Sequence, residues 1–256
     1  MAQDDATGQE ATGTEVIAQG IIKLPKGDLA WLINKDVVPG GEGAPVASFP
    51  VGFGLTDGGS VEVRDEATGI LPGNLNLIRT LTPYPGFGGE IRVGMADVNR
   101  DGVPDTITGA GPGGGPHVKV FDGATGTELR SFFAYDPGFR RGITVAVGDV
   151  TGDGYADIVP GAGPGGGPHI QVFDGRTGLA VRSFMAYDPG FRGGVNVGAG
   201  DVNRDGRDDV IVGANSGGGP HVYVRSGKDD AVLTQFFAYD PGFRGGVSVG
   251  SGDLDG

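Results

Sequence analysis

The chain of 256 residues contains 54 Gly and 17 Pro, and its 19 basic and 32 acidic residues give a formal net charge of −13. This acidity disfavours nucleic acid and anionic membrane surfaces as partners and suits metal cations. The absence of Cys excludes disulfides and thiol chemistry. No apolar run of about 18 residues occurs, so we expect no membrane span.

The N-terminal quarter of the chain is irregular. Residues 1–15 are polar without an apolar secretory core, and we expect a disordered leader there. Residues 16–45 contain the strand-like segments IAQGIIKL and LAWLINKDVV. Residues 46–89 weakly copy a unit that recurs downstream, because Ser60–Asp65 (SVEVRD) matches His117–Asp122 (HVKVFD). We group residues 16–89 as an N-terminal β segment with a degenerate unit; residues 16–45 either complete that unit or form a separate small β domain.

From residue 90 to residue 256 the chain repeats with a period of 52 residues. Ala186–Val195 and Ala238–Val247 both read AYDPGFRGGV, and this period also separates the members of three series. The series are Asp97, Asp149, Asp201 and Asp253; His117, His169 and His221; and Phe87, Phe139, Phe191 and Phe243. The chain therefore holds three full units and the start of a fourth.

Each unit contains about four strand candidates separated by Gly, Pro or Asp. In the second full unit they are Ile143–Val147, Asp157–Pro160, His169–Phe173 and Ala180–Ala186. Four strands in roughly 40–50 residues is typical of a β-propeller blade, whereas the rungs of a β-solenoid are shorter. We predict an all-β fold of four-stranded antiparallel propeller blades. Because propellers typically close with about four to eight blades, we expect an incomplete propeller.

Three loops carry oxygen side chains at positions 1, 3, 5 and 9, Gly at position 6, and a backbone carbonyl at position 7. Calcium takes about six to eight oxygen ligands, which such loops supply. The candidate ligands are Asp97, Asn99, Asp101, Val103 and Asp105; Asp149, Thr151, Asp153, Tyr155 and Asp157; and Asp201, Asn203, Asp205, Arg207 and Asp209. We expect about three calcium ions.

Other interpretations of these loops fit less well. An EF-hand closes with Glu at position 12 between helices, whereas these loops close with Asp at position 9 between strands. Magnesium prefers fewer protein ligands, and zinc or copper would favour His or Cys. Asp, Asn and Gly also form ordinary turns, but a turn does not require three carboxylates.

The loops, together with the Gly-Ala-Gly-Pro segments at Gly109 and Gly161, resemble FG-GAP repeats. That family includes the blades of integrin α-subunit propellers and the VCBS-type repeats of bacterial surface proteins. The resemblance covers residues 85–256 and implies calcium between the first two strands of each blade and an extracellular or cell-surface location. Thr151 departs from the usual Asn or Asp, which predicts a weaker second site.

Further recurrent residues have two interpretations each. His117, His169 and His221 either bind a transition metal together or, as we prefer, each open a strand and hydrogen-bond a neighbour. Arg140, Arg192 and Arg244 either bind an anionic partner or, as we prefer, pair with Asp of the adjacent blade. The phenylalanines of the Tyr-Asp-Pro-Gly-Phe segments are expected to pack between blades.

No catalytic fingerprint is present in the sequence. We therefore expect a non-catalytic calcium-binding module for adhesion, surface display, or protein or glycan interaction. The alternative is a carbohydrate-active propeller, lyase-like or sugar-binding. The fourth metal loop begins at Asp253 and stops at Gly256, so we expect a segment of a longer array, able to self-associate through its unfinished edge.

Overall fold

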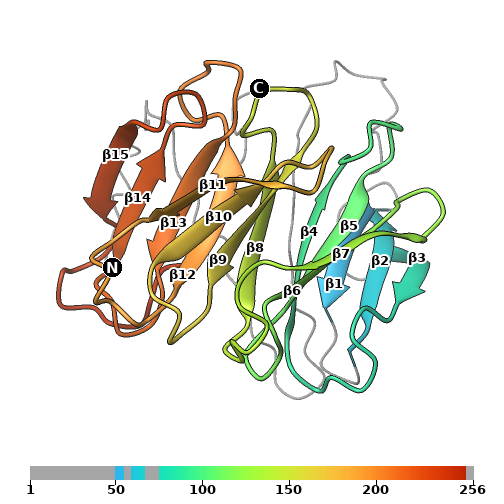
Figure 1. Cartoon of the computed structure of the whole chain (residues 1–256), viewed down its shortest axis with the longest axis horizontal. Helices are drawn as coiled ribbons and strands as arrows, with labels where there is room; N and C mark the ends of the chain where they lie inside the picture. Colours follow the sequence, from blue (N-terminus) through green and yellow to red (C-terminus); the bar gives the residue numbers. More distant parts are fainter. Residues whose placement is uncertain (1–49, 55–58, 67–74, 252–256) are drawn as a thin grey trace, which may run out of the picture.

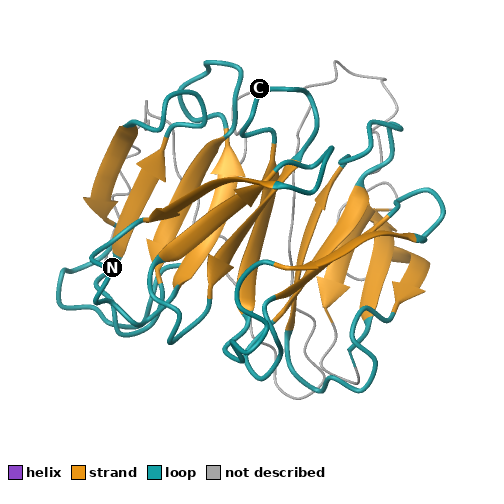
Figure 2. Ribbon diagram, in the orientation of Figure 1, coloured by secondary structure: helices purple, strands orange, loops and turns teal. Residues whose placement is uncertain are grey.

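A computed structural model describes residues 50–54, 59–66 and 75–251. These residues contain strands, turns and loops but no helix, and therefore no helix that could cross a membrane (Figure 2). The strands are β1 (Pro50–Gly54), β2 (Val61–Glu66), β3 (Leu75–Leu81), β4 (Ile91–Ala96), β5 (Asp105–Ala110), β6 (His117–Phe121), β7 (Glu128–Phe133), β8 (Ile143–Gly148), β9 (Asp157–Ala162), β10 (His169–Phe173), β11 (Ala180–Met185), β12 (Val195–Gly200), β13 (Asp209–Ala214), β14 (His221–Arg225) and β15 (Val232–Phe237). The expected leader at 1–15, the segment 16–45 and the start of a fourth metal loop at 253–256 lie outside the described residues.

The strands form four antiparallel sheets, each of which follows the order of the chain. The first sheet contains β1–β3, and the second, third and fourth contain β4–β7, β8–β11 and β12–β15. The sheets follow one another across the molecule, with the first and the fourth at opposite ends (Figure 1). The predicted all-β fold of four-stranded antiparallel blades is confirmed, and the described sheets form an open array.

In each four-stranded sheet, burial is greatest in the second strand and least in the fourth. The first strands β4, β8 and β12 pack against one another, and every residue of β5, β9 and β13 is buried. The fourth strands β7 and β11 are mostly exposed, and β15 is exposed throughout. This gradient is that of a propeller, in which the inner strands meet near a common axis and the outer strands face solvent.

The hydrophobic cores lie between successive sheets. One cluster joins Val61 and Val63 of the first sheet to Ile91 and Val93 of the second. Corresponding clusters fill the junctions between the second and third sheets and between the third and fourth. Each sheet is therefore stabilised by its neighbours, as expected for a repeat protein.

A glycine in each second strand allows the next sheet to approach closely. A Cβ atom on Gly161 would lie 2.8 Å from the side chains of both Val195 and Val197. Gly109 and Gly213 occupy the equivalent places and are equally crowded by the segment that follows. The Gly-Ala pair that recurs in the sequence is thus explained by packing at the junctions.

A tyrosine from the loop after each of the first three sheets bonds the sheet that follows. The hydroxyl of Tyr135 donates to the carbonyl oxygens of Pro160 and His169, at 2.9 and 2.8 Å. Tyr84 and Tyr187 make the equivalent bonds to the second and fourth sheets. Burial raises the pKa of all three phenols, so each hydroxyl keeps the proton that it donates.

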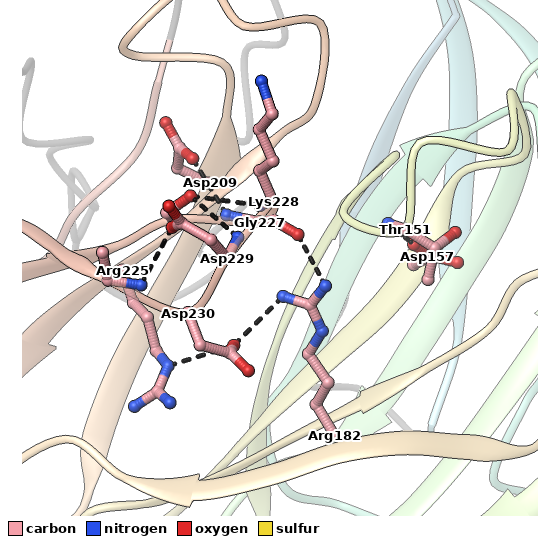
Figure 3. A network of polar contacts seen from close by, with 11 residues as sticks. Thr151, Asp157, Arg182, Asp209, Arg225, Gly227, Lys228, Asp229 and Asp230 are labelled. Atoms are coloured by element: carbon pink, nitrogen blue, oxygen red, sulfur yellow. Dashed lines mark hydrogen bonds and ion pairs between the residues drawn. The ribbon is translucent and has the colours of Figure 1, made fainter.

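Arginine and phenylalanine side chains complete these junctions. Arg182 of β11 donates to the carbonyl of Gly227 and pairs with Asp230, both in the turn between β14 and β15 (Figure 3). Arg79 and Arg130 reach the equivalent turns of the second and third sheets. The predicted packing of phenylalanines between blades is confirmed for Phe139 and Phe191, which each lie against a glycine of the next sheet, as does Phe87, whereas Phe243 is 43% exposed.

Candidate metal centres

Each predicted metal loop joins the first and second strands of a four-stranded sheet and folds around its first aspartate. The second carboxylate oxygen of Asp97 accepts a hydrogen bond from the N–H of Gly102 at 2.9 Å. Asp149 and Asp201 accept the equivalent bond from Gly154 and Gly206, both at 2.8 Å. These position-6 glycines have φ values of 84 to 85°, a left-handed conformation that favours Gly.

The closing aspartates at position 9 are fully buried. Asp105, Asp157 and Asp209 have 0% exposure, and each begins the second strand of its sheet. In every case one carboxylate oxygen accepts an N–H near the start of the loop and the other an N–H of the turn after the third strand. Figure 3 shows two of these carboxyls, Asp209 bonded to Gly227 and Asp157 beside Thr151. The position-9 aspartate therefore ties the loop to the sheet.

Burial also changes the protonation of these carboxyls. Desolvation raises the pKa of Asp157 to about 6 and raises the pKa of Asp105 and Asp209 above the usual range. Neighbouring loop carboxylates raise each pKa further, whereas the backbone N–H donors lower it. A bound cation would favour the ionised form of these groups.

In the first loop, three carboxylates converge. Asp101, Asp105 and Asp122 each offer one oxygen, and these three oxygens lie within 4.8 Å of one another. The side-chain amide nitrogen of Asn99 lies between two of these carboxylates and donates to Asp101 and Asp122 at 3.0 and 3.1 Å. The set is anionic and built from oxygens, which suits a hard divalent cation.

Asp122 is a candidate ligand that the motif of the loop does not include. It follows β6, more than fifteen residues beyond the loop, and also accepts bonds from the N–H and hydroxyl of Thr125. Those bonds hold the pKa of Asp122 below its usual range. Asp174 recurs at the equivalent position with the same threonine contacts, and Ser226 replaces it in the fourth sheet. This 52-residue recurrence was the signal in the sequence that could have found it.

The second loop offers a different feature. The hydroxyl oxygen of Thr151 is buried and forms no hydrogen bond of normal geometry among the described residues. It lies near the carboxyl of Asp157, whose pKa it helps to lower. A hydroxyl oxygen at position 3, beside the position-9 carboxylate, fits a cation ligand.

The structure places the remaining predicted ligands within the same loops. The position-5 carboxylates of Asp101, Asp153 and Asp205 accept the N–H of the position-7 residues Val103, Tyr155 and Arg207. The position-3 oxygens of Asn99 and Asn203 accept the N–H of position 5 at 2.9 Å. The hydrogen bonds therefore hold the side chains of positions 1 and 5 within all three loops, and that of position 3 within the first and third loops.

Neighbouring loops also contact one another. The carboxylate of Asp208 in the third loop accepts the N–H of Asp149 at 2.7 Å, and the N–H of Asp208 donates back to the carbonyl of Asp149 at 2.9 Å. Burial raises the pKa of Asp208, and the nearby carboxylates of Asp149 and Asp201 add to this effect. The guanidinium of Arg100 lies 5.1 Å from the ring centre of Tyr155 in the second loop. The loops are thus linked across the sheet junctions.

The histidines follow the preferred structural interpretation. His117 and His169 open strands β6 and β10, and their side chains hydrogen-bond Ser131 and Ser183 at 2.8 and 2.7 Å. The carboxylate group that could hold a metal ion among the described residues includes no histidine. Burial lowers the pKa of all three repeat histidines, so the structure favours their neutral form.

The arginine of the last Tyr-Asp-Pro-Gly-Phe segment behaves differently from the prediction. Arg244 donates to the carbonyl oxygens of Pro241 and Phe243 in its own loop, at 2.6 and 3.0 Å. The ion pair across a junction is made instead by Arg182, with Asp230 at 3.2 Å. Arg182 lies on an outer strand over the turn of the following sheet, whereas Arg244 belongs to the last described sheet, which no further described sheet follows.

The fold and the repeated loops define the class: an array of β-propeller blades, of which the three four-stranded ones carry an acidic loop between their first two strands. Residues 141–178 match the family model of the FG-GAP repeat. They span β8 to β10 with the second loop, so this segment of the chain is similar to an FG-GAP repeat.

The other comparisons add little to this assignment. No curated protein matches the chain. One similar solved structure is described as "Structure of Dos1 propeller", with 16% sequence identity and a TM-score of 0.48. The similarity covers 75% of this chain and 46% of that one, so this chain spans about half the length of that protein.

Proposed function

We propose that this chain is a calcium-binding FG-GAP propeller module without catalytic activity. The observation that carries the proposal is the set of three loops in register, in which the carboxylates of positions 1 and 5 are bonded within the loop and that of position 9 joins the loop to the turn after the third strand. Calcium would be held by the loop oxygens, with Asp122 and Asp174 as additional carboxylates in the first two loops. A bound divalent ion would supply positive charge to these acidic loops and hold each one against its sheet.

The biological role that follows is extracellular adhesion, surface display, or interaction with a protein or glycan. A net charge of −13 and loops that need free calcium suit an extracellular environment. The polar residues that could take part in a reaction recur from one sheet to the next. None of them is therefore distinguished as a catalytic group. Turnover of a polysaccharide by the purified chain, abolished by one substitution in the sheets, would overturn the non-catalytic part of the proposal.

Calorimetric titration of the metal-free chain with calcium tests the metal sites. We expect three ions per chain, and Asp153→Asn should weaken one site while the other two remain. The matched control is Asp188→Asn, which alters an exposed aspartate of the same sheet that bonds Gly190 outside the metal loop. A stoichiometry of zero or one for the wild-type chain would reject the proposal.

A further inference from the structure

The second metal loop differs from its neighbours at the positions that vary between the loops. Its positions 4, 7 and 8 are all uncharged and are occupied by Gly152, Tyr155 and Ala156. The first and third loops carry charged side chains at these positions, namely Arg100, Arg207 and Asp208. Apart from its own candidate ligands, the charges that surround the second loop therefore come from neighbouring parts of the fold.

The first loop places a guanidinium group against positions 6 and 7 of the second loop. The central carbon of the Arg100 guanidinium lies 5.1 Å from the ring centre of Tyr155. A Cβ atom on Gly154 would lie 3.1 Å from the same guanidinium. Arg176, in the turn between β10 and β11, adds a second cation at 5.6 Å from the Tyr155 ring centre. This side of the second loop is therefore positively charged.

The third loop places another guanidinium group against position 4 of the second loop. A Cβ atom on Gly152 would lie 2.6 Å from Nε of Arg207 and 2.8 Å from Cγ of the same side chain. Because glycine has no Cβ, it leaves the space that this arginine occupies. Guanidinium groups from both neighbouring loops therefore lie against the second loop.

The third loop also supplies a carboxylate of opposite charge. The side chain of Asp208 accepts the N–H of Asp149, the first ligand position of the second loop, at 2.7 Å. The equivalent positions of the first two loops are Pro104 and Ala156, so this carboxylate is an addition to the repeat. A Cβ atom on Gly148 would overlap the Asp208 carboxylate, and glycine at this position therefore makes room for it. The negative charge is thus fixed beside position 1 of the second loop.

From these contacts we propose that the neighbouring loops set the calcium affinity of the second loop, which Arg100 and Arg207 lower and Asp208 raises. A guanidinium group repels a divalent cation, whereas a carboxylate attracts it. These side chains contact the loop itself, within the screening length of about 8 Å at physiological ionic strength, so their charges act on a cation held there. The inference rests on the calcium proposal above and adds the residues that regulate one of its sites.

Calorimetric titration with calcium tests the inference on a chain whose first and third loops are disabled by Asp101→Asn and Asp205→Asn. In this background Arg100→Gln should tighten calcium binding by the second loop, and Asp208→Asn should weaken it, by roughly three- to tenfold each. Asparagine at position 208 keeps an oxygen that can accept the N–H of Asp149, so this variant removes the charge and retains the bond. Damage to the fold would only weaken binding, so the tighter binding of Arg100→Gln cannot arise from such damage.

Two control variants make the same changes of net charge at the opposite end of the strands. Arg141→Gln lies in the loop between β7 and β8, and Asp188→Asn lies in the loop between β11 and β12. Both should leave the calcium affinity of the second loop unchanged. A further control uses Asp153→Asn with Asp205→Asn, which leaves the first loop intact. In that background Asp208→Asn should not change calcium binding.

The outcomes separate this inference from the proposed function. If Arg100→Gln or Asp208→Asn leaves the affinity of the second loop unchanged, or if the controls shift it equally, the inference is wrong. The natural chain would then still bind three calcium ions, and the proposed function would stand. A natural chain that binds no calcium would reject the proposed function and this inference with it.

Discussion

At the scale of single residues, position 9 of each loop has a structural role besides any metal ligation. A buried carboxylate whose two oxygens each accept a backbone N–H fixes the loop and the distant turn together. Position 5 is different, because its carboxylate is bonded within its own loop. The two positions should therefore respond differently when calcium is removed.

Asp209→Ala should destabilise the fold even in excess chelator. It would leave the buried N–H groups of Val202 and Gly227 without an acceptor, at a cost of about 1–3 kcal/mol for each group. The control Asp205→Ala should change the chelated protein little and lower stability mainly in calcium. Urea unfolding of both variants with and without calcium measures this, and equal losses in chelator would contradict the structural role.

His169 should make the fold less stable in mild acid. Burial lowers its pKa in the folded state below the usual histidine value of 6.5, so the unfolded chain binds the additional proton first. The contribution to stability is therefore complete above pH 6.5 and is lost as the pH falls through that value toward the folded pKa. Denaturant unfolding at several pH values should give a shallower loss for His169→Gln than for wild type; identical slopes would speak against this effect.

At the scale of strands and sheets, close contact between successive sheets determines stability. The sheets touch through glycines in the second strands and through tyrosine hydroxyls bonded to two strands at once. These contacts explain why the sequence retains Gly-Ala in β5, β9 and β13 where strand propensity alone would favour larger residues.

Gly161→Ala should destabilise the junction between the third and fourth sheets. The added methyl group would lie 2.7 Å from the hydroxyl of Thr144 and 2.8 Å from two valine side chains, and such overpacking costs about 1–3 kcal/mol. Gly88→Ala is the control, since nothing lies within 4 Å of its added Cβ. Thermal unfolding of both variants decides the matter, and equal melting temperatures would show that the junction adapts.

At the scale of the whole molecule, the acidic loops lie at the junctions between sheets. Each sheet is stabilised by packing against its neighbours. Removing calcium should therefore lower the melting temperature of the entire array. Binding to the native state contributes about 2.7 kcal/mol per site when calcium is a hundredfold above Kd.

Calorimetry in calcium and in excess chelator measures this contribution. Asp153→Asn should remove the contribution of one site to the calcium-dependent stabilisation. The contributions of the other two sites should remain. A melting temperature that does not change in chelator would show that the loops keep their conformation and stability without metal.

The sequence by itself determined the repeat, the class of fold and most of the strand limits. The predicted strand His169–Phe173 agrees with β10 at both ends, and Ile143–Val147 and Asp157–Pro160 fall one and two residues short of β8 and β9. These features depend on alternating side chains and turn residues, which are local along the chain. The residues of the metal loops could also be identified from the sequence. The binding of calcium to these loops stays a prediction.

The tertiary structure decided which of the recurrent residues come into contact. Asp122 joins the first loop because β6 ends beside it, and Asp208 bonds Asp149 because two sheets pack in one register. The tyrosine hydroxyls find their carbonyl partners 24 to 34 residues away along the chain. Such contacts arise only when sheets pack face to face, so the spacing of residues within one repeat does not encode them.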